Sequence, residues 1–345
     1  MIVTLHPDGL VGEVKGKGAN ANWMGKKSLA AINEMGLAHE NLVVSYFDSD
    51  TCVHPKYFSY LSYKFLTYKN PLRVSFQPVV NYNNNIWDAP APMRVTAFGT
   101  IFWLLTELMR PERMYTFSSH SMSFKALVDV DFWEKDIVTD DSRIFLQAFF
   151  RYEGDYTVEP MYIPVSMDTV MDESIWQGFK SLYKQQRRWA WGVEHFPYMI
   201  WRFRQSRKIS FYKKFKHVFN LLEGMYSWAS APLIMLILGR LPLYIAGRSD
   251  ISSSVIVQNA PFVLERLMWL SMLGIFSSAI LSLMILPKMP QKYPKWKYLI
   301  MLLQWLLMPI TFIVFGAIPA IEAQTRLALG PKHHLGFFVT PKERK

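Results

Sequence analysis

The chain has 345 residues, of which 51% are hydrophobic and 15% aromatic, and its formal net charge is +11. Its single cysteine, Cys52, excludes an internal disulfide and a cysteine-rich metal site, which is typical of a reducing compartment. The positive charge indicates a polyanionic partner: nucleic acid, an anionic membrane surface or a nucleotide diphosphate. Seven basic residues precede the first long apolar stretch, as in segments beside a membrane, so we expect no nucleic-acid partner. They are Arg202, Arg204, Arg207, Lys208, Lys213, Lys214 and Lys216.

A glycine-rich segment near the N-terminus is suited to phosphate groups. Residues 16–22 predict a loop that offers backbone amides to a diphosphate, with the ammonium groups of Lys15 and Lys17 nearby. The segment lacks the spacing of a P-loop.

The rest of the first half predicts alternating helices and strands. Composition and the spacing of apolar residues predict helices at residues 26–34, 55–68 and 96–109. Apolar runs predict strands at residues 41–47, 73–79 and 115–124. A further helix is expected from Thr139 to residue 150, capped by Thr139 and with acids in its first turn. This alternation predicts an α/β domain.

Two acidic motifs are candidates for chemistry. Asp48-Ser49-Asp50 follows a predicted strand, so both carboxylates can reach one hard divalent cation that also binds substrate phosphates. The alternative is an ordinary aspartate-rich turn. Thr139-Asp140-Asp141 is either a plain helix N-terminus or the source of a general base.

A basic and aromatic block lies near the middle of the chain, at Gln185-Gln186-Arg187-Arg188-Trp189. A guanidinium beside an indole is suited to a phosphate-bearing ligand and to a sugar ring held against an aromatic face. The alternative is a basic amphipathic helix that lies on lipid headgroups. Trp176 and Trp191 share the predicted helix and are further candidates for contact with sugar rings.

Three C-terminal stretches approach the length of a membrane span, at residues 219–245, 262–286 and 298–321. The link at residues 287–297 is basic, whereas residues 249–258 are polar with one charge. By the positive-inside rule, the basic link and the N-terminal half are cytoplasmic and residues 249–258 face outward.

The order of these motifs resembles the membrane-bound processive family-2 glycosyltransferases, the cellulose, hyaluronan and poly-N-acetylglucosamine synthase type. The resemblance covers nearly the whole chain: a Lys/Gly/Ala/Asn loop, two acidic motifs, Gln-x-x-Arg-Trp, apolar segments, and Phe337-Phe338-Val339-Thr340-Pro341-Lys342, which is similar to a gating loop. It implies a partial glycosyltransferase-A domain followed by an α-helical membrane region. The expected divisions are residues 1–175 (cytoplasmic catalytic domain), 176–217 (interfacial helices), 218–325 (membrane helices) and 326–345 (cytoplasmic tail).

The resemblance also implies residue roles. Asp50 would hold Mg²⁺ or Mn²⁺ on the donor diphosphate, and Asp141 would deprotonate the acceptor hydroxyl. Residues implied in substrate binding are Lys15, Lys17, Asn20, Asp48, Asp140, Gln185, Arg188, Trp189, Thr340 and Lys342. The implied reaction moves a sugar from a nucleotide-diphospho-sugar, a UDP-sugar in most of these enzymes, to a glycan or lipid-linked acceptor with inversion.

Two departures from the family pattern keep alternatives open. Before Lys15 the chain lacks the family's first strand and nucleotide-binding loop, so we expect either a fragment or a second polypeptide that completes the domain. His120 lies where synthases tend to have an acceptor motif, and it is either an acceptor contact or a structural histidine. Transfer of one sugar to a lipid carrier, and an inactive domain that assembles with a synthase, remain alternative functions.

The expected location is the cell membrane, as a multi-pass protein with its catalytic domain in the cytoplasm. Three full spans would place the tail outside, where it could not contact a cytoplasmic nucleotide. We therefore expect part of residues 296–329 to lie along the membrane surface or to re-enter, so that the tail returns to the cytoplasm.

Overall fold

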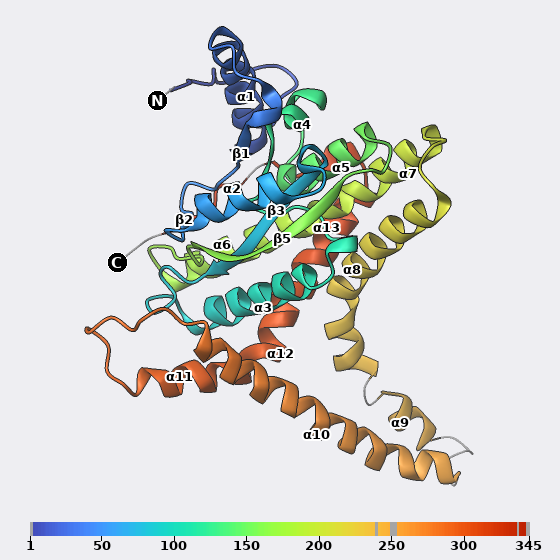
Figure 1. The fold of residues 1–345 in the computed structure, drawn as a ribbon. Coiled ribbons are helices and arrows are strands. Elements are labelled where there is room, and N and C mark those ends of the chain that lie inside the picture. Colours follow the sequence, from blue (N-terminus) through green and yellow to red (C-terminus); the bar gives the residue numbers. More distant parts are fainter. Residues whose placement is uncertain (1–2, 239–240, 249–253, 337, 343–345) are drawn as a thin grey trace.

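A mixed β-sheet lies at the centre of the N-terminal part, and a helical C-terminal part extends away from it (Figure 1). The structure is a computed structural model that describes residues 3–238, 241–248, 254–336 and 338–342. The fold is an α/β sheet with flanking helices followed by long apolar helices, as the sequence predicts.

The five strands lie in the order β1-β4-β3-β5-β2. They are β1 (Val43–Ser45), β2 (Cys52–Val53), β3 (Val74–Tyr82), β4 (Ser121–Ser123) and β5 (Thr157–Met167). β3 and β5 are parallel, and β4 is antiparallel to both β1 and β3. β1, β3 and β5 therefore run in the same direction, and their carboxyl ends lie at one edge of the sheet.

Seven helices accompany the sheet in the described part of the N-terminal 205 residues. They are α1 (Lys17–Glu34), α2 (Tyr57–Thr67), α3 (Ala91–Leu108), α4 (Phe124–Asp129), α5 (Asp140–Arg151), α6 (Ile175–Ala190) and α7 (His195–Gln205). Short 3-10 turns lie at His39–Asn41, Pro71–Arg73, Pro111–Arg113 and Trp191–Glu194.

Apolar residues at helical spacing fix two of these helices on the sheet. Tyr57, Leu61 and Phe65 recur every four residues on α2, and they pack in one core cluster with Phe76 and Val165. α5 places Ile144, Phe145 and Phe149 in a second cluster with Tyr156 and Val158. Because α5 is anchored by this core, the acids at its N-terminus have a fixed position relative to the sheet.

The C-terminal part consists of α8 (Phe211–Leu238), α9 (Leu241–Ala246), α10 (Val255–Met284), α11 (Lys297–Leu303), α12 (Met308–Thr311), a π-helix (Phe312–Ala317) and α13 (Ile318–Ala328). A 3-10 turn at Gln304–Leu307 separates α11 from α12, and another at Pro331–His333 follows α13. Within the described residues, two helical segments are long and apolar enough to cross a membrane, Val255–Met284 and Lys297–Ala328. The predicted stretch 219–245 is instead divided between α8 and α9, and residues 239–240 and 249–253 lie outside the described part.

Two predictions of local structure are wrong, and two strands were not predicted. Residues 16–22 do not form a loop, because α1 begins at Lys17 and its Gly18 is used for close packing. The strand predicted at residues 115–124 is limited to Ser121–Ser123, because a turn with φ of +69° at Ser119 interrupts it. β2 and β5 were not predicted. In β5, Pro160 and Pro164 lack the N–H that a strand donates, and the pairing of β5 with β3 shifts register between Met161 and Pro164.

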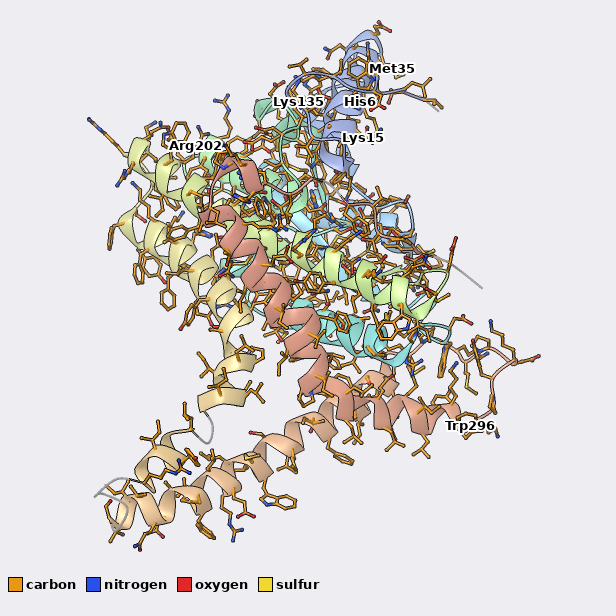
Figure 2. The ribbon with its side chains drawn as sticks, turned by 180° about the vertical axis from the view of Figure 1, so that it is seen from behind. His6, Lys15, Met35, Lys135, Arg202 and Trp296 are labelled. Carbon is orange, nitrogen blue, oxygen red and sulfur yellow. The ribbon has the colours of Figure 1, made fainter. Side chains whose placement is uncertain are left out.

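Part of the basic segment at residues 202–216, which runs from α7 into α8, makes hydrogen bonds within the protein. Lys213 donates to the backbone carbonyl of Gly154 at 2.9 Å, and Lys214 donates to those of Phe203 and Ser206 at 2.7 and 2.6 Å. In Figure 2, Arg202 lies at the opposite end of the molecule from Trp296, which begins the last apolar segment. Lys213 and Lys214 therefore join α8 to α7 and to the sheet-containing N-terminal part.

Candidate active site

A lysine and two aspartates meet at the carboxyl edge of the sheet. The ammonium of Lys17, at the start of α1, lies 2.7 Å from Asp48 Oδ1 and 3.0 Å from Asp141 Oδ1. It also lies 3.8 Å from the centre of the Tyr46 ring. Burial acts to lower the pKa of Lys17, but the charges of Asp141 and Asp48 outweigh burial and raise it above its ordinary value. Three segments far apart in the sequence therefore form one charged cluster.

Asp48 is held as a carboxylate. Its Oδ2 accepts a hydrogen bond of 2.7 Å from the Ser118 hydroxyl, in the turn before β4. Burial acts to raise the pKa of Asp48, but Lys17 and the Ser118 hydrogen bond offset this effect, so the pKa falls to about 2.

Asp140 and Asp141 are adjacent in sequence but lie in different environments. Asp140 is 3% exposed, and its Oδ2 accepts a hydrogen bond of 2.6 Å from the Tyr46 hydroxyl. Burial and the neighbouring charge of Asp141 raise the pKa of Asp140 to about 7. The Asp141 side chain is 28% exposed, so a substrate can reach it.

Gly18 allows α1 to approach these acids. A Cβ at Gly18 would lie 2.9 Å from Asp140 Cβ and 3.1 Å from the backbone oxygen of Glu134, closer than real Cβ contacts. The glycine is therefore required by packing against the acidic helix, and it places Lys17 over the cluster.

The C-terminal tail reaches the second aspartate of the DxD motif. Lys342 donates to Asp50 Oδ2 at 2.6 Å, and the backbone N–H of Asp168, at the end of β5, donates to the same oxygen at 2.8 Å. The backbone of Met171 pairs with the tail at Lys342. Thr340 is partly buried in this tail, whereas Phe337 lies outside the described residues. The predicted gating segment thus contacts the acidic motif.

α6 carries the Gln-x-x-Arg-Trp block to the same edge. Gln185 is buried, and Trp189 lies against Tyr82, at the end of β3, with ring centres 5.8 Å apart. Gln185, Trp189, Tyr82 and Asp168 line one small cavity. The pKa of the Tyr82 hydroxyl is raised by burial and, to a smaller extent, by the charges of Asp48, Asp141 and Asp50. The charge of Arg188 acts to lower it. Tyr82 therefore lies between the acidic cluster and this block.

Comparison with protein families identifies the family of the chain. Residues 43–320 match the family described as Glycosyl transferase family group 2, which is well over half of the chain. The chain belongs to this glycosyltransferase family. A search of curated proteins finds no match. Membership in the family makes this chain a glycosyltransferase that uses a nucleotide-sugar donor and an acceptor.

The residues of the glycosyltransferase fit a divalent cation completed by substrate oxygens. Among the described residues, no group of three or more His, Cys, Asp or Glu side chains could hold a metal ion by itself. Asp48 and Asp50 nevertheless present carboxylate oxygens to the ammonium groups of Lys17 and Lys342, so each already binds a cation. This oxygen donor set suits Mg²⁺ or Mn²⁺ bound with a diphosphate.

Two predicted phosphate-binding residues are not part of this cluster. Lys15 is exposed and pairs with Asp8 at 3.0 Å. Asn20 is exposed, and its Oδ1 lies 2.9 Å from His6 Nδ1. Figure 2 shows His6 and Lys15 together at the N-terminal end of the molecule. Lys15 lies before α1, which begins at Lys17, and the Asn20 side chain contacts His6.

The other predicted aromatic and histidine contacts lie in different surroundings. Trp191 is 2% exposed and donates its indole N–H to Glu194, and Trp176 is exposed at the far end of α6. His120 is fully buried, with Nδ1 2.8 Å from the Phe117 carbonyl oxygen. Burial lowers the pKa of His120 to about 4, so the ring is neutral at neutral pH. This environment supports the structural alternative for His120.

Sequence reasoning missed four residues of the site: Tyr46, Tyr82, Ser118 and Asp168. Strand alternation places Tyr46 on the same face as Asp48, which was a usable signal. Tyr82 and Asp168 lie at the ends of β3 and β5, where parallel strands bring ligand-binding residues together. Ser118 had no such signal, because it depends on the turn at Ser119.

Proposed function

We propose that this glycosyltransferase transfers a sugar from a nucleotide-diphospho-sugar to an acceptor hydroxyl, with inversion, in polysaccharide synthesis at a membrane. The observation that carries the proposal is the position of Asp141. Its partly exposed carboxylate lies beside Lys17, which also contacts the DxD motif at Asp48. A base and a donor-binding motif therefore meet through one lysine.

Asp141 is the proposed general base, and Asp140 is not. The Asp140 carboxyl is buried and has a pKa raised to about 7, so it carries a proton during much of the time near neutral pH. Asp141 is more exposed and can accept the proton of a bound hydroxyl. A base on one side of the sugar and a leaving diphosphate on the other favour direct displacement, and hence inversion at the anomeric carbon.

Cationic side chains are proposed to bind the leaving diphosphate. Lys17 and Lys342 contact Asp48 and Asp50 in this structure, and Arg188 acts on the same cluster from α6. These cations can turn to the donor phosphates, where charge develops as the glycosidic bond breaks. A divalent cation bound at Asp50 would neutralise part of the same charge.

The acceptor sugar is proposed to lie beside Trp189 and Gln185. The Trp189 indole, packed near Tyr82, offers an aromatic edge at the cavity that Gln185 also lines. An apolar ring surface and one polar side chain suit a sugar, which has both apolar faces and hydroxyl groups.

The central experiment is sugar incorporation from a panel of radiolabelled nucleotide sugars by the purified chain in lipid vesicles. Asp141→Asn is expected to lower incorporation by at least 100-fold, and Asp155→Asn, at an exposed pair with Arg73, serves as the matched control. Equal incorporation by wild type and Asp141→Asn rejects the assigned base. The anomeric configuration of the product, measured by NMR, tests inversion.

The size of the product separates the alternatives. A polymer supports polysaccharide synthesis, whereas one sugar on an extractable lipid supports transfer to a lipid carrier. No incorporation and no donor hydrolysis, with every donor tested, supports an inactive domain.

Cys52 provides a test of donor binding that does not need turnover. It is the only cysteine, it is exposed, and its Sγ lies 3.9 Å from the backbone oxygen of Asp50. A nucleotide diphosphate bound with Mg²⁺ near Asp50 is expected to slow alkylation of Cys52. Protection by UDP but not by other nucleoside diphosphates supports a UDP-sugar donor. Binding only after a second purified polypeptide is added supports a partner that completes the domain, and binding by the chain alone removes the need for it.

We propose a multi-pass membrane location with a cytoplasmic catalytic domain. The large exposed side chains of α10, such as Trp269, Leu270 and Phe276, support contact with lipid. The contact of Lys342 with Asp50 supports a tail on the same side as the catalytic domain. A membrane-impermeant thiol reagent should label Cys52 in inside-out vesicles and not in intact cells. Labelling only in intact cells contradicts the proposed orientation.

A further inference from the structure

Glu194 connects the two halves of the site, although it contacts none of the proposed substrate-binding residues. It lies in the 3-10 turn Trp191–Glu194, directly after α6. Its Oε1 accepts a hydrogen bond from the Thr139 hydroxyl, and its Oε2 accepts one of 2.9 Å from the Trp191 indole N–H. The Glu194 carboxylate therefore links Thr139, next to Asp140, to Trp191, two residues after Trp189.

Thr139 is used differently from an ordinary helix cap. It occupies the N-cap position of α5, but its side chain accepts no hydrogen bond from the helix. Its hydroxyl donates to Glu194 instead. A side-chain cap normally stabilises its helix, and at Thr139 a contact between α5 and the segment after α6 takes the place of that cap.

The surroundings of Glu194 are buried and polar. Burial acts to raise the pKa of Glu194, and the Thr139 hydrogen bond, the charge of Arg143 and the Trp191 hydrogen bond oppose it. Arg143 is itself fixed, because it donates to Glu134 at 2.8 Å and to His195 Nδ1 at 3.2 Å. Hydrogen bonds from Thr139 and Trp191 therefore hold the carboxylate, and the fixed charge of Arg143 acts on it.

The C-terminal tail also contacts Trp191. The His334 ring lies 5.5 Å from the Trp191 ring, edge to face, and the chain then continues to Lys342 at Asp50. α5, the end of α6 and the tail therefore meet around Glu194 and Trp191. These three segments carry the proposed base, the acceptor-binding block and the gating loop.

We propose that Glu194 is a positioning residue that holds the base-bearing end of α5 in register with the acceptor-binding end of α6. Its two hydrogen bonds fix Thr139 and Trp191, and through them the relative placement of Asp141 and Trp189. This inference rests on the proposed function. Removing one of the bonds displaces the base from the acceptor, whereas the part of the donor site formed by Asp48 after β1 and Lys17 on α1 stays in place.

The kinetic test compares Glu194→Gln with the matched control Glu153→Gln, which changes an exposed pair with Lys208. Glu194→Gln presents an amide N–H where a carboxylate oxygen now accepts. It is expected to lower kcat for transfer at least 10-fold and to change the donor KM less than 2-fold. The control is expected to match wild type in both. Unchanged kcat in Glu194→Gln, with active wild type, overturns the inference and leaves the proposed function intact.

A conservative series at Thr139 separates positioning from general stability. Thr139→Ser keeps the hydroxyl and should retain near-wild-type kcat, whereas Thr139→Val should lose activity as Glu194→Gln does. The double variant Thr139→Val with Glu194→Gln should be no slower than Glu194→Gln alone, since both remove one interaction. Independent, multiplying losses in the double variant refute the assigned link.

Hydrogen–deuterium exchange tests the link even if wild type transfers no sugar. The amides at the start of α5, residues 140–143, should exchange at least 10-fold faster in Glu194→Gln, whereas those of α2 should be unchanged. Unaltered exchange at residues 140–143 rejects Glu194 as an anchor for α5. Inactive wild type together with faster exchange in the variant rejects the proposed function and supports the anchoring role.

Discussion

Replacing Lys17 with methionine removes the cation that two carboxylates share. Asp48 and Asp141 lie 2.7 and 3.0 Å from its ammonium, and the Lys17 side chain is 19% exposed. Lys15→Met is the matched control, because the same change two residues earlier affects only an exposed pair with Asp8. We expect Lys17→Met to destabilise the fold and Lys15→Met to leave it within about 0.5 kcal/mol of wild type.

The size of the effect follows from the pKa of Asp48. Burial acts to raise that pKa and Lys17 lowers it, with a net value of about 2 against an ordinary value of 3.8. A shift of this size corresponds to a stabilisation on the order of 2 kcal/mol. Lys17 is the strongest of the groups that lower the pKa, and Ser118 and Lys342 also contribute. The depressed pKa contributes stability that is present above about pH 4 and is lost as the pH falls through about 2.

The assay is thermal unfolding of wild type, Lys17→Met and Lys15→Met in detergent micelles, from pH 7 to pH 3. At pH 7 the midpoint of Lys17→Met should be several degrees lower than that of the other two proteins. The difference should shrink toward pH 3, as Asp48 begins to be protonated. Equal midpoints of the two variants at pH 7, or a difference that does not shrink in acid, refute the assigned role of Lys17.

Three other changes test the same region. Gly18→Ala places a Cβ 2.9 Å from Asp140 Cβ, so we expect the free energy of unfolding to fall by about 1–3 kcal/mol and transfer to be at least 10-fold slower. The control Gly224→Ala, where a Cβ meets no atom within 4 Å, should keep full activity. Asp140 has a folded pKa of about 7, above its ordinary 3.8, so its protonated form contributes stability below about pH 4 that is lost as the pH rises through about 7. Wild type should therefore lose stability relative to Asp140→Asn between pH 4 and pH 8, and parallel unfolding curves exclude this. Lys342→Met removes one cation that contacts Asp50, so steady-state kinetics should show a lower Mg²⁺ concentration for half-maximal rate and a higher donor KM; unchanged values for both argue against a role of the tail in donor binding.

Strong local patterns predicted much of the fold. The helices at α2, α3 and α5 and the strands at β1 and β3 follow from apolar spacing that tertiary packing reinforces. β5 was missed for a local reason, since two prolines argue against a strand, and its place beside β3 depends on a register shift that no local pattern records. The prediction began the first helix at residue 26 instead of Lys17, because Gly16 and Gly18 are typical of a loop. The packing of Gly18 against Asp140, which explains this glycine, is visible only in the structure.

The candidate site was predictable where acidic motifs follow a predicted strand or begin a predicted helix. Asp48, Asp50 and Asp141 were identified as acidic motifs, and the structure brings the segments that carry them together through Lys17 and Lys342. The distinction between Lys15 and Lys17 was not predictable, because it depends on where a helix begins. The roles of all these residues stay predictions until the variants are measured.

The contact between Lys342 and Asp50 has a practical consequence for any laboratory that prepares this protein. Three residues would separate Lys342, which contacts Asp50, from an affinity tag or fluorescent protein joined after Lys345. The bulk or charge of such a tag competes with the substrate for the acidic motif. A polyhistidine tag would add metal-binding imidazoles at that position. Inactivity of a C-terminally tagged preparation would therefore say little about the enzyme, and fusions should be made at the N-terminus.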